Sequence, residues 1–473
     1  MIILGTYFLF AAATPGSASH DDPVAPILIA LVMMAFAAAI GGRVLRRFGQ
    51  AAVLGELLIG VLVGNVGYLY HQPNITVIRE GDTISTIVQT ALVQQVTVGQ
   101  AARATLPPGP HSERIAEILE GPRGLKVLAV YSFVDQVSRI AIIILLFLVG
   151  LETSLVEMRE VGWTAGIVGV LGVILPLGLG LVLTTLLLPD SSFAVHLFIG
   201  GVLTATSVGI TARVLRDLGQ MDRPESKIIL GAAVIDDVLG LLVLAIVTAL
   251  IVNGSVSLVG IFVITLKAIA FLVGSIGIGM WVTPRIVRRI ARLDFENIKL
   301  LFGVGFAFVF SWLANLAGLA TIIGAFAAGL ILESFFDKEL TGFSLRDMLS
   351  PIESLIVPIF FVLMGLQVKL EAFNNLSVVF LAAGLTTVAI IGKIASGFAA
   401  GRGLKRLAIG IGMMPRGEVG LIFAGIGRGL GVVSDSIFAS IVIMVIITTL
   451  LTPPLLKLTL ANGIHVADPN PAQ

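Results

Sequence analysis

Apolar segments, each about long enough to cross a bilayer, follow one another along almost the whole chain. About 20 mostly apolar residues cross the hydrocarbon core as a helix, and a helix satisfies its own backbone hydrogen bonds there. About thirteen such spans are predicted, at residues 24–42, 51–70, 137–155, 161–188, 193–215, 228–252, 258–282, 298–317, 318–332, 352–368, 376–400, 404–426 and 432–451. Because only 12% of the residues are charged, against about 25% in soluble domains, the sequence predicts an all-α integral membrane protein.

One apolar stretch, residues 298–332, is too long for a single crossing. Polar and glycine residues at 315–318 can turn the chain within it. We therefore expect two helices here rather than one, and the prediction of thirteen spans depends on this division.

Lysine and arginine residues gather in alternate connections between the predicted spans. The basic connections carry Arg43, Arg46 and Arg47, then Arg213, Arg216, Arg223 and Lys227, then Arg285, Arg288, Arg289 and Arg292, then Lys338 and Arg346, and finally Arg402, Lys405 and Arg406. The connections at 189–192, 253–257 and 315–318 carry no lysine or arginine. Because basic connections stay on the cytoplasmic side, the pattern predicts an external amino terminus and a cytoplasmic carboxyl terminus.

Three segments lie outside the spans. The first, at residues 1–20, resembles the apolar region and small-residue cleavage zone of a signal peptide. The alternative is an extra helix. The second is the one long connection, which falls on the outer face and is expected to form a partly ordered cap with a helix at 112–120. The third is a short cytoplasmic tail, so we expect no nucleotide-binding regulatory domain. The predicted order is 1–20 signal-like segment, 21–70 two spans, 71–136 cap, 137–458 eleven spans and 459–473 tail.

Composition argues against several classes of function. The chain has no cysteine, which excludes disulfides, thiolate metal sites and cysteine nucleophiles. Its five histidines are scattered without metal-ligand spacing, which argues against a hydrolase. The net charge of +1 gives no sign of nucleic-acid binding. We therefore expect neither an enzyme nor a resident cofactor.

Two adjacent carboxylates, Asp236 and Asp237, interrupt an otherwise apolar span. An ionised side chain at the bilayer centre costs roughly 2.5–3.5 kcal/mol, so such residues are candidates for function. Adjacent helical residues point about 100° apart, so the two carboxylates cannot share one environment. Lys393, in the middle of the span at 376–400, supplies a buried cation that can pair with either. The alternatives are aspartates that only join helices and a purely structural ion pair.

Two other spans contain helix-breaking segments. One places the hydroxyl residues Thr204, Thr206, Ser207 and Thr211 within a span, and the other contains Pro415, Arg416, Gly417 and Glu418. Interrupted helices in corresponding places of two halves indicate a transporter built from inverted repeats, with its substrate at the midplane. Freed carbonyls and hydroxyls are hard oxygen ligands that suit an alkali cation beside a carboxylate. Arg416 and Glu418 are expected to compensate the half-helix dipoles and one another, or to form a plain salt bridge.

The order of these motifs resembles that of the monovalent cation/proton antiporters, in particular the bacterial sodium/proton exchangers of the second cation:proton antiporter family. The resemblance covers residues 24–451 and rests on segment 204–211, the aspartate pair, Lys393 and segment 415–418. It implies thirteen helices with two crossed broken helices, divided between a dimerisation domain and a mobile core domain that moves like an elevator. It also implies a homodimer, with the ion site on core helices at 193–252 and 376–426.

The resemblance assigns roles residue by residue. It makes Asp237 the principal aspartate for the cation and the proton, Asp236 its neighbour, and Lys393 the lysine that pairs with that neighbour. It places Thr206 and Ser207 in the unwound segment that lines the site, where the carboxylates hold an alkali cation. The long external segment departs from some relatives, and we expect no counterpart of the cytosolic nucleotide-binding domain of the glutathione-gated potassium efflux systems.

The expected function is exchange of Na+, or of Li+ or K+, for protons by alternating access, in the service of pH homeostasis. The alternative is a cation-coupled symporter of an organic anion, which would require a large pocket with anion-binding groups; the sequence offers only Arg416. A channel fits less well, because a buried counter-ion and two broken helices suit alternating access. The expected location is the bacterial inner membrane, with a thylakoid or another energised internal membrane as the alternative.

Overall fold

The structure, a computed structural model of the chain, describes most of the residues from 24 to 461. The gaps fall at 49–51, 107, 153–161, 208–209, 212–213, 216–219, 221–222, 254–257, 291–295, 318, 320 and 340–343. The signal-like segment at 1–20 and the tail beyond residue 461 lie outside the described residues.

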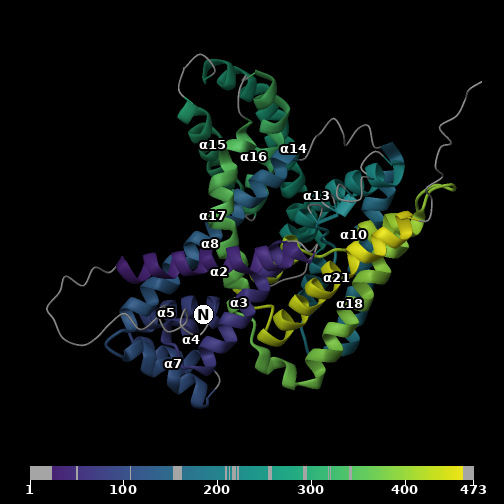
Figure 1. Cartoon of the computed structure of the whole chain (residues 1–473). Helices are drawn as coiled ribbons and strands as arrows, with labels where there is room; N and C mark the ends of the chain where they lie inside the picture. Colours follow the sequence, from purple (N-terminus) through teal and green to yellow (C-terminus); the bar gives the residue numbers. More distant parts are fainter. Residues whose placement is uncertain are drawn as a thin grey trace, which may run out of the picture. The chain divides into compact units, whose positions relative to one another are not determined.

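All regular elements in the described part of the chain are helical. Labelled as in Figure 1, they are α2 (Ala25–Arg47), α3 (Ala52–Leu69), α4 (Pro73–Arg79), α5 (Asp82–Gln94), α6 (Val98–Thr105), α7 (Pro110–Glu120), α8 (Gly124–Glu152), α10 (Gly162–Leu187), α11 (Phe193–Val202), α13 (Pro224–Asn253), α14 (Leu258–Ile290), α15 (Glu296–Leu316), α16 (Thr321–Glu339), α17 (Leu345–Leu366), the 3-10 helix η1 (Leu370–Asn374), α18 (Leu376–Gly397), α19 (Arg406–Gly412), α20 (Glu418–Gly429) and α21 (Asp435–Ala461). The predicted all-α class is confirmed.

Many of these helices are long and apolar enough to cross a membrane. Among the described residues there are 9 such helices, with three shorter apolar helices at Phe193–Val202, Thr321–Glu333 and Val419–Gly429. The stretch predicted to divide does so, because α15 ends at Leu316 and α16 begins at Thr321. The chain is therefore a multi-pass integral membrane protein, while the count of thirteen spans stays a prediction.

The chain forms two compact units. The first comprises Met1–Leu155, Leu244–Val379 and Leu421–Val442, and the second comprises Val156–Val243, Phe380–Gly420 and Ile443–Gln473. In the first unit α8 packs against α16, α3 packs against both α2 and α17, and α16 packs against α14 and α15 (Figure 1). Glycines permit the close approach of α8 and α16, since Gly150 and Gly329 face each other across the contact. Small residues of this kind let membrane helices approach closely.

The long connection after α3 is more ordered than the sequence predicted. It forms the four short helices α4 to α7, and the predicted helix at 112–120 lies within α7. The next span also begins early, because α8 starts at Gly124 rather than near residue 137. Its first turns carry polar residues such as Lys126 and Asp135, which a hydropathy window excludes from a span although they are compatible with a helix.

The second unit holds both interrupted helices. The first break follows α11 and covers residues 203–207, and the second lies between α19 and α20 at residues 413–417. The breaks have a local cause, because Pro415 has no N–H to donate and hydroxyl side chains compete for backbone groups near residue 206. The prediction of two broken helices is confirmed.

A tightly packed apolar core reaches the second of these breaks. Small side chains of α10 and α13, such as Ala165 and Ala232, pack with Ile409 and Met413 around the end of α19. Ala165, Ala232 and Ile409 are 0% exposed. Small residues at these contacts bring the helix backbones close, so the polar groups at the breaks lie in a water-poor interior.

Candidate functional site

The two broken segments lie against each other and satisfy each other's backbone groups. Ser207 N donates to Pro415 O at 2.9 Å, and Thr206 Oγ1 donates to Met413 O at 3.1 Å. Thr211 Oγ1 donates to Gly412 O at 2.7 Å. A backbone carbonyl freed from a helix must find another donor in an apolar interior. The hydroxyl residues of the first segment are therefore the donors that make the second break tolerable.

The buried ion pair joins α13 and α18 within the same unit. Lys393 Nζ lies 2.8 Å from Asp236 Oδ1 and 2.9 Å from Asp236 Oδ2, and both side chains are 0% exposed. Gly172 of α10 leaves room for the pair, because a Cβ at that position would lie 3.2 Å from the lysine nitrogen. The structure pairs Lys393 with Asp236, which is one of the two partners that the sequence offered.

Arg416, in the second broken segment, reaches the first one through its side chain. Its guanidinium donates to the Ala205 carbonyl and, at 3.3 Å, to Thr206 Oγ1. The side chain is 0% exposed, and it lies just beyond the carboxyl end of α11. The carboxyl end of a helix carries partial negative charge, so the expected compensation of this half-helix by Arg416 is consistent with its position.

The remaining predicted residues are placed as follows. Thr204 Oγ1 donates to Gly201 O at 2.7 Å and so closes the end of α11, while Pro415 is buried within the second break. Asp237 lies on α13 directly after Asp236, and Glu418 is the first residue of α20. The side chains of Asp237 and Glu418 lie outside the described part of the structure, so their roles stay predictions.

Sequence reasoning did not find two contributions to this region. Thr448 and Thr449 of α21 bond to the backbone of Arg416, and Gly172 borders the ion pair. The only sequence signal was a cluster of threonines at 448, 449 and 452 inside an apolar span. Threonines in membrane helices commonly bond to their own helix, so nothing in the sequence indicated that two of these would bond to Arg416.

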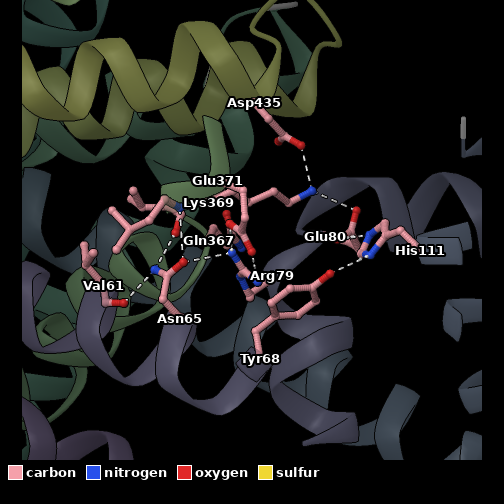
Figure 2. A network of polar contacts seen from close by, with 12 residues as sticks. Val61, Asn65, Tyr68, Arg79, Glu80, His111, Gln367, Lys369, Glu371 and Asp435 are labelled. Atoms are coloured by element: carbon pink, nitrogen blue, oxygen red, sulfur yellow. Dashed lines mark hydrogen bonds and ion pairs between the residues drawn. The ribbon is translucent and has the colours of Figure 1, made fainter. Parts of the chain in front are cut away.

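A second polar network, partly buried, lies in the first unit (Figure 2). Arg79 of α4 pairs with Glu371 of η1 at 2.6 Å and donates to Asn65 Oδ1 at 3.0 Å. Its guanidinium also stacks 4.1 Å from the centre of the Tyr68 ring. These contacts tie the first cap helix to the end of α3 and to the turn after α17.

The same network continues through Glu80. His111 Nε2 donates to Glu80 Oε1 at 2.9 Å, and Lys369 Nζ donates to Glu80 Oε2 at 3.0 Å and to Asp435 Oδ2 at 2.7 Å (Figure 2). Burial alone would raise the pKa of Glu80, but the bonds and charges of His111 and Lys369 outweigh it and lower the pKa from 4.5 to about 2. Arg428 pairs with Asp435 at 2.7 Å, so α20 and α21 join the network at their adjoining ends.

Comparisons with known proteins bear on what such a chain is. The family model described as "Sodium/hydrogen exchanger, transmembrane" matches residues 31–461. The chain belongs to the sodium/hydrogen exchanger family. This membership agrees with the resemblance seen in the motif order.

Individual relatives of this exchanger support the same placement. The high-affinity Na+/H+ antiporter NhaS3 of Synechocystis sp. is 38% identical over 442 residues, covering 92% of this chain and 90% of the relative. The Na+/H+-K+ antiporter GerN of Bacillus cereus is 36% identical over 351 residues, covering 73% of this chain and 88% of the relative. The sodium proton antiporter MjNhaP1 of Methanocaldococcus jannaschii shares the fold, with a TM-score of 0.62 at 14% identity over 93% of this chain and 97% of that chain.

Proposed function

We propose that this exchanger is a secondary active transporter that exchanges a monovalent cation for protons, with Na+ as the cation and Li+ or K+ as alternatives. The observation that carries the proposal is the fully buried pair of Asp236 and Lys393, in the same unit as two broken helices that bond to each other. Such charges are kept inside a membrane protein at a cost. The names of the relatives at 38% and 36% identity support Na+ as the cation.

In this proposal Asp237 is the residue that binds the transported cation and the proton in turn. It holds either a cation that has lost its water or a proton, while Asp236 is its neighbour and is held by Lys393. Thr206 and Ser207 line the site and offer hard oxygen ligands for an alkali cation. Competition at one carboxylate couples the two fluxes, because the site cannot carry both loads at once.

The charge of the site couples ion binding to the conformational change that carries the site across the membrane. An empty, ionised aspartate pair would carry uncompensated charge through an apolar barrier, which costs several kcal/mol, so only the loaded site crosses. The proposed movement is alternating access of elevator type, in which a mobile core domain moves against a dimerisation domain in a homodimer. The division of the chain into two compact units supports this proposal.

Lys393 determines the proposed stoichiometry. If cation binding at the aspartates displaces Lys393 and it loses its proton, two protons move for each cation and exchange is electrogenic. A transport rate that does not respond to membrane potential would count against this part of the proposal.

The chain is proposed to lie in a bacterial inner membrane, or in a thylakoid or another energised internal membrane, with its amino terminus outside. The alternation of basic connections supports this orientation. The alternative of a cation-coupled symporter of an organic anion finds no support in the relatives described above, which carry antiporter names.

The test is transport by purified protein in liposomes that carry a proton gradient and a pH dye. Na+, Li+, K+ or choline is added to the parent, to Asp237→Asn, and to the control Asp190→Asn, which changes an exposed carboxylate in the connection before α11. We expect Na+ to collapse the gradient in the parent and the control. Asp237→Asn should behave like empty liposomes, because an amide holds neither cation nor proton. A parent that responds to no cation at several pH values would overturn the proposal.

A further inference from the structure

Two residues of α21 hydrogen-bond to the backbone of the second broken segment, and the proposed exchange cycle gives them no role. Arg416 N donates to Thr448 Oγ1 at 3.3 Å, and Thr449 Oγ1 donates to Arg416 O at 3.1 Å. Two neighbouring threonines therefore hold the N–H and the carbonyl of one and the same residue. All three residues belong to the second unit.

These two bonds replace what a helix would otherwise provide. Residues 413–417 are not helical, so the backbone groups of Arg416 lack the ladder partners of a regular helix. Thr448 is 0% exposed and Thr449 is 2% exposed, so water does not reach this contact. Backbone groups buried in an apolar interior need a protein partner, and the two hydroxyls are that partner.

Arg416 in turn contacts the other broken segment. Its side chain donates to the Ala205 carbonyl and to Thr206 Oγ1, while Thr206 Oγ1 itself donates to Met413 O. The hydroxyls of α21 thus fix the backbone of Arg416, and its guanidinium in turn fixes the oxygens of the first segment. The chain of contacts ends on Thr206, which the proposed cycle places at the cation.

Two prolines follow these threonines in α21. Pro453 and Pro454 lie inside the helix and have no N–H for the carbonyls four residues earlier, which belong to Thr449 and Leu450. Proline inside a helix is a common cause of a bend. A change in this bend would move both hydroxyls and, through them, the backbone of Arg416.

We infer that Thr448 and Thr449 are positioning residues for the cation site, which set the geometry of its oxygen ligands through Arg416 without touching the ion. This inference rests on the proposed exchange function. It predicts that loss of either hydroxyl weakens the hold on a desolvated cation more than it slows turnover, because the ligands are present but displaced.

The experiment compares Thr449→Val and Thr448→Val with Thr449→Ser, which keeps the hydroxyl. Matched controls are Thr184→Val and Thr386→Val, because both residues are buried in the second unit and their hydroxyls donate only to their own helices, α10 and α18. Each variant is assayed for Na+-driven proton flux over a range of Na+ concentration and pH, and for its melting temperature.

We expect Thr449→Val and Thr448→Val to raise the KM for Na+ about 5-fold to 10-fold, the change produced by losing one buried hydrogen bond, with kcat within about 2-fold of the parent. Low pH should raise the KM for Na+ by the same factor in the parent and in both variants, because protons compete for the same carboxylate in each. Thr449→Ser and both controls should keep the parental KM. A structural role alone would lower the melting temperature and the amount of active protein, and would leave KM unchanged.

Several outcomes would overturn the inference. One is an unchanged KM in both α21 valine variants while the parent exchanges Na+, which removes the inference and leaves the exchange function standing. Another is failure of Thr449→Ser to restore KM. If neither α21 valine variant folds although both controls do, the hydroxyls hold the whole unit rather than the site. A parent without cation-driven exchange overturns the proposed function, and the inference with it.

Discussion

At the scale of single residues, the fully buried pair of Asp236 and Lys393 is a costly feature of the second unit. Each of the two charges loses its water on burial, and the attraction between them repays this only with good geometry. The geometry is good, because the lysine nitrogen lies within 2.9 Å of both carboxylate oxygens. The pair is therefore stable as a pair, and either residue left alone would be a buried, uncompensated charge.

This balance predicts an asymmetry between single and double substitutions. Lys393→Met should lower the free energy of unfolding by about 3–5 kcal/mol, because the buried Asp236 loses the ammonium group that bonds to both of its oxygens. The double variant Asp236→Asn/Lys393→Met should recover more than half of that loss. Thermal unfolding of the purified variants in one detergent measures both effects.

Lys267→Met is the control, because this lysine of α14 is exposed and its loss should change the free energy of unfolding by no more than about 0.5 kcal/mol. A double variant that is as unstable as Lys393→Met would show that the uncompensated charge of Asp236 is not what destabilises the single variant.

At the scale of elements, the crossing of the two broken segments depends on the absence of a side chain at Gly417. A Cβ at this position would lie 2.6 Å from Ser207 Oγ and 2.7 Å from Ile210 Cδ1. It would also lie 2.9 Å from Ser207 Cβ, and because a Cβ moves only with its own backbone, the two segments would have to shift in a close-packed interior. The contact between Ser207 and the second segment therefore requires glycine at position 417.

We predict that Gly417→Ala forces the segments apart and lowers Na+-driven proton flux in liposomes at least about 10-fold, the effect of a small displacement of reacting or binding groups. Gly166→Ala on α10 is the matched control, because a Cβ there has nothing within 4 Å. Parental flux in Gly417→Ala would show that the crossing tolerates the added methyl group and that its geometry does not limit transport.

The cap helices are held by the network around Glu80, and this attachment should depend on acid. The pKa of Glu80 is lowered from 4.5 to about 2. Its ionised carboxylate therefore stabilises the folded cap fully above pH 4.5, and this stabilisation is lost as the pH falls towards 2. We expect the protection factors of the amides in α4 and α7, which correct for the intrinsic pH dependence of hydrogen exchange, to fall over this range.

At neutral pH, Glu80→Gln should already show faster exchange in α4 and α7 than the parent, because the amide cannot replace the charge facing His111 and Lys369. Glu117→Gln, which changes an exposed residue of α7, should exchange like the parent. Equal protection in the parent at pH 7 and pH 3 would argue that the apolar contacts of the cap hold it without Glu80.

At the scale of the whole molecule, the basic connections predict the orientation of the chain in the membrane. The chain contains no cysteine, so one introduced cysteine reports the side on which it lies. Gln94→Cys at the end of α5 and Arg402→Cys between α18 and α19 are both exposed positions. We expect a membrane-impermeant maleimide to label Gln94→Cys in intact cells. It should label Arg402→Cys only after the cells are permeabilised.

The reverse labelling pattern would show that the chain is inserted in the opposite sense. Labelling of both positions in intact cells would show that they lie on the same side, and that the number of spans between them is even rather than odd.

Features that depend on short stretches of chain were predictable from the sequence. The apolar spans, the division between α15 and α16 and both helix breaks follow from hydropathy, proline and hydroxyl residues within a few positions of one another. The aspartates at 236 and 237 and Lys393 were conspicuous because a charge in an apolar span is costly and is rarely kept without a function. The sequence by itself therefore determined the class of fold, the membrane setting and the residues of the proposed site.

Only the tertiary structure decided which of these residues meet. It paired Lys393 with Asp236, placed Thr448 and Thr449 on the backbone of Arg416, and joined the cap to distant turns through Glu80. Hydrogen bonds and ion pairs act over a few ångströms, and helix packing brings together residues far apart in sequence. A threonine that bonds to its own helix and one that holds another segment are identical in sequence, and only packing distinguishes them.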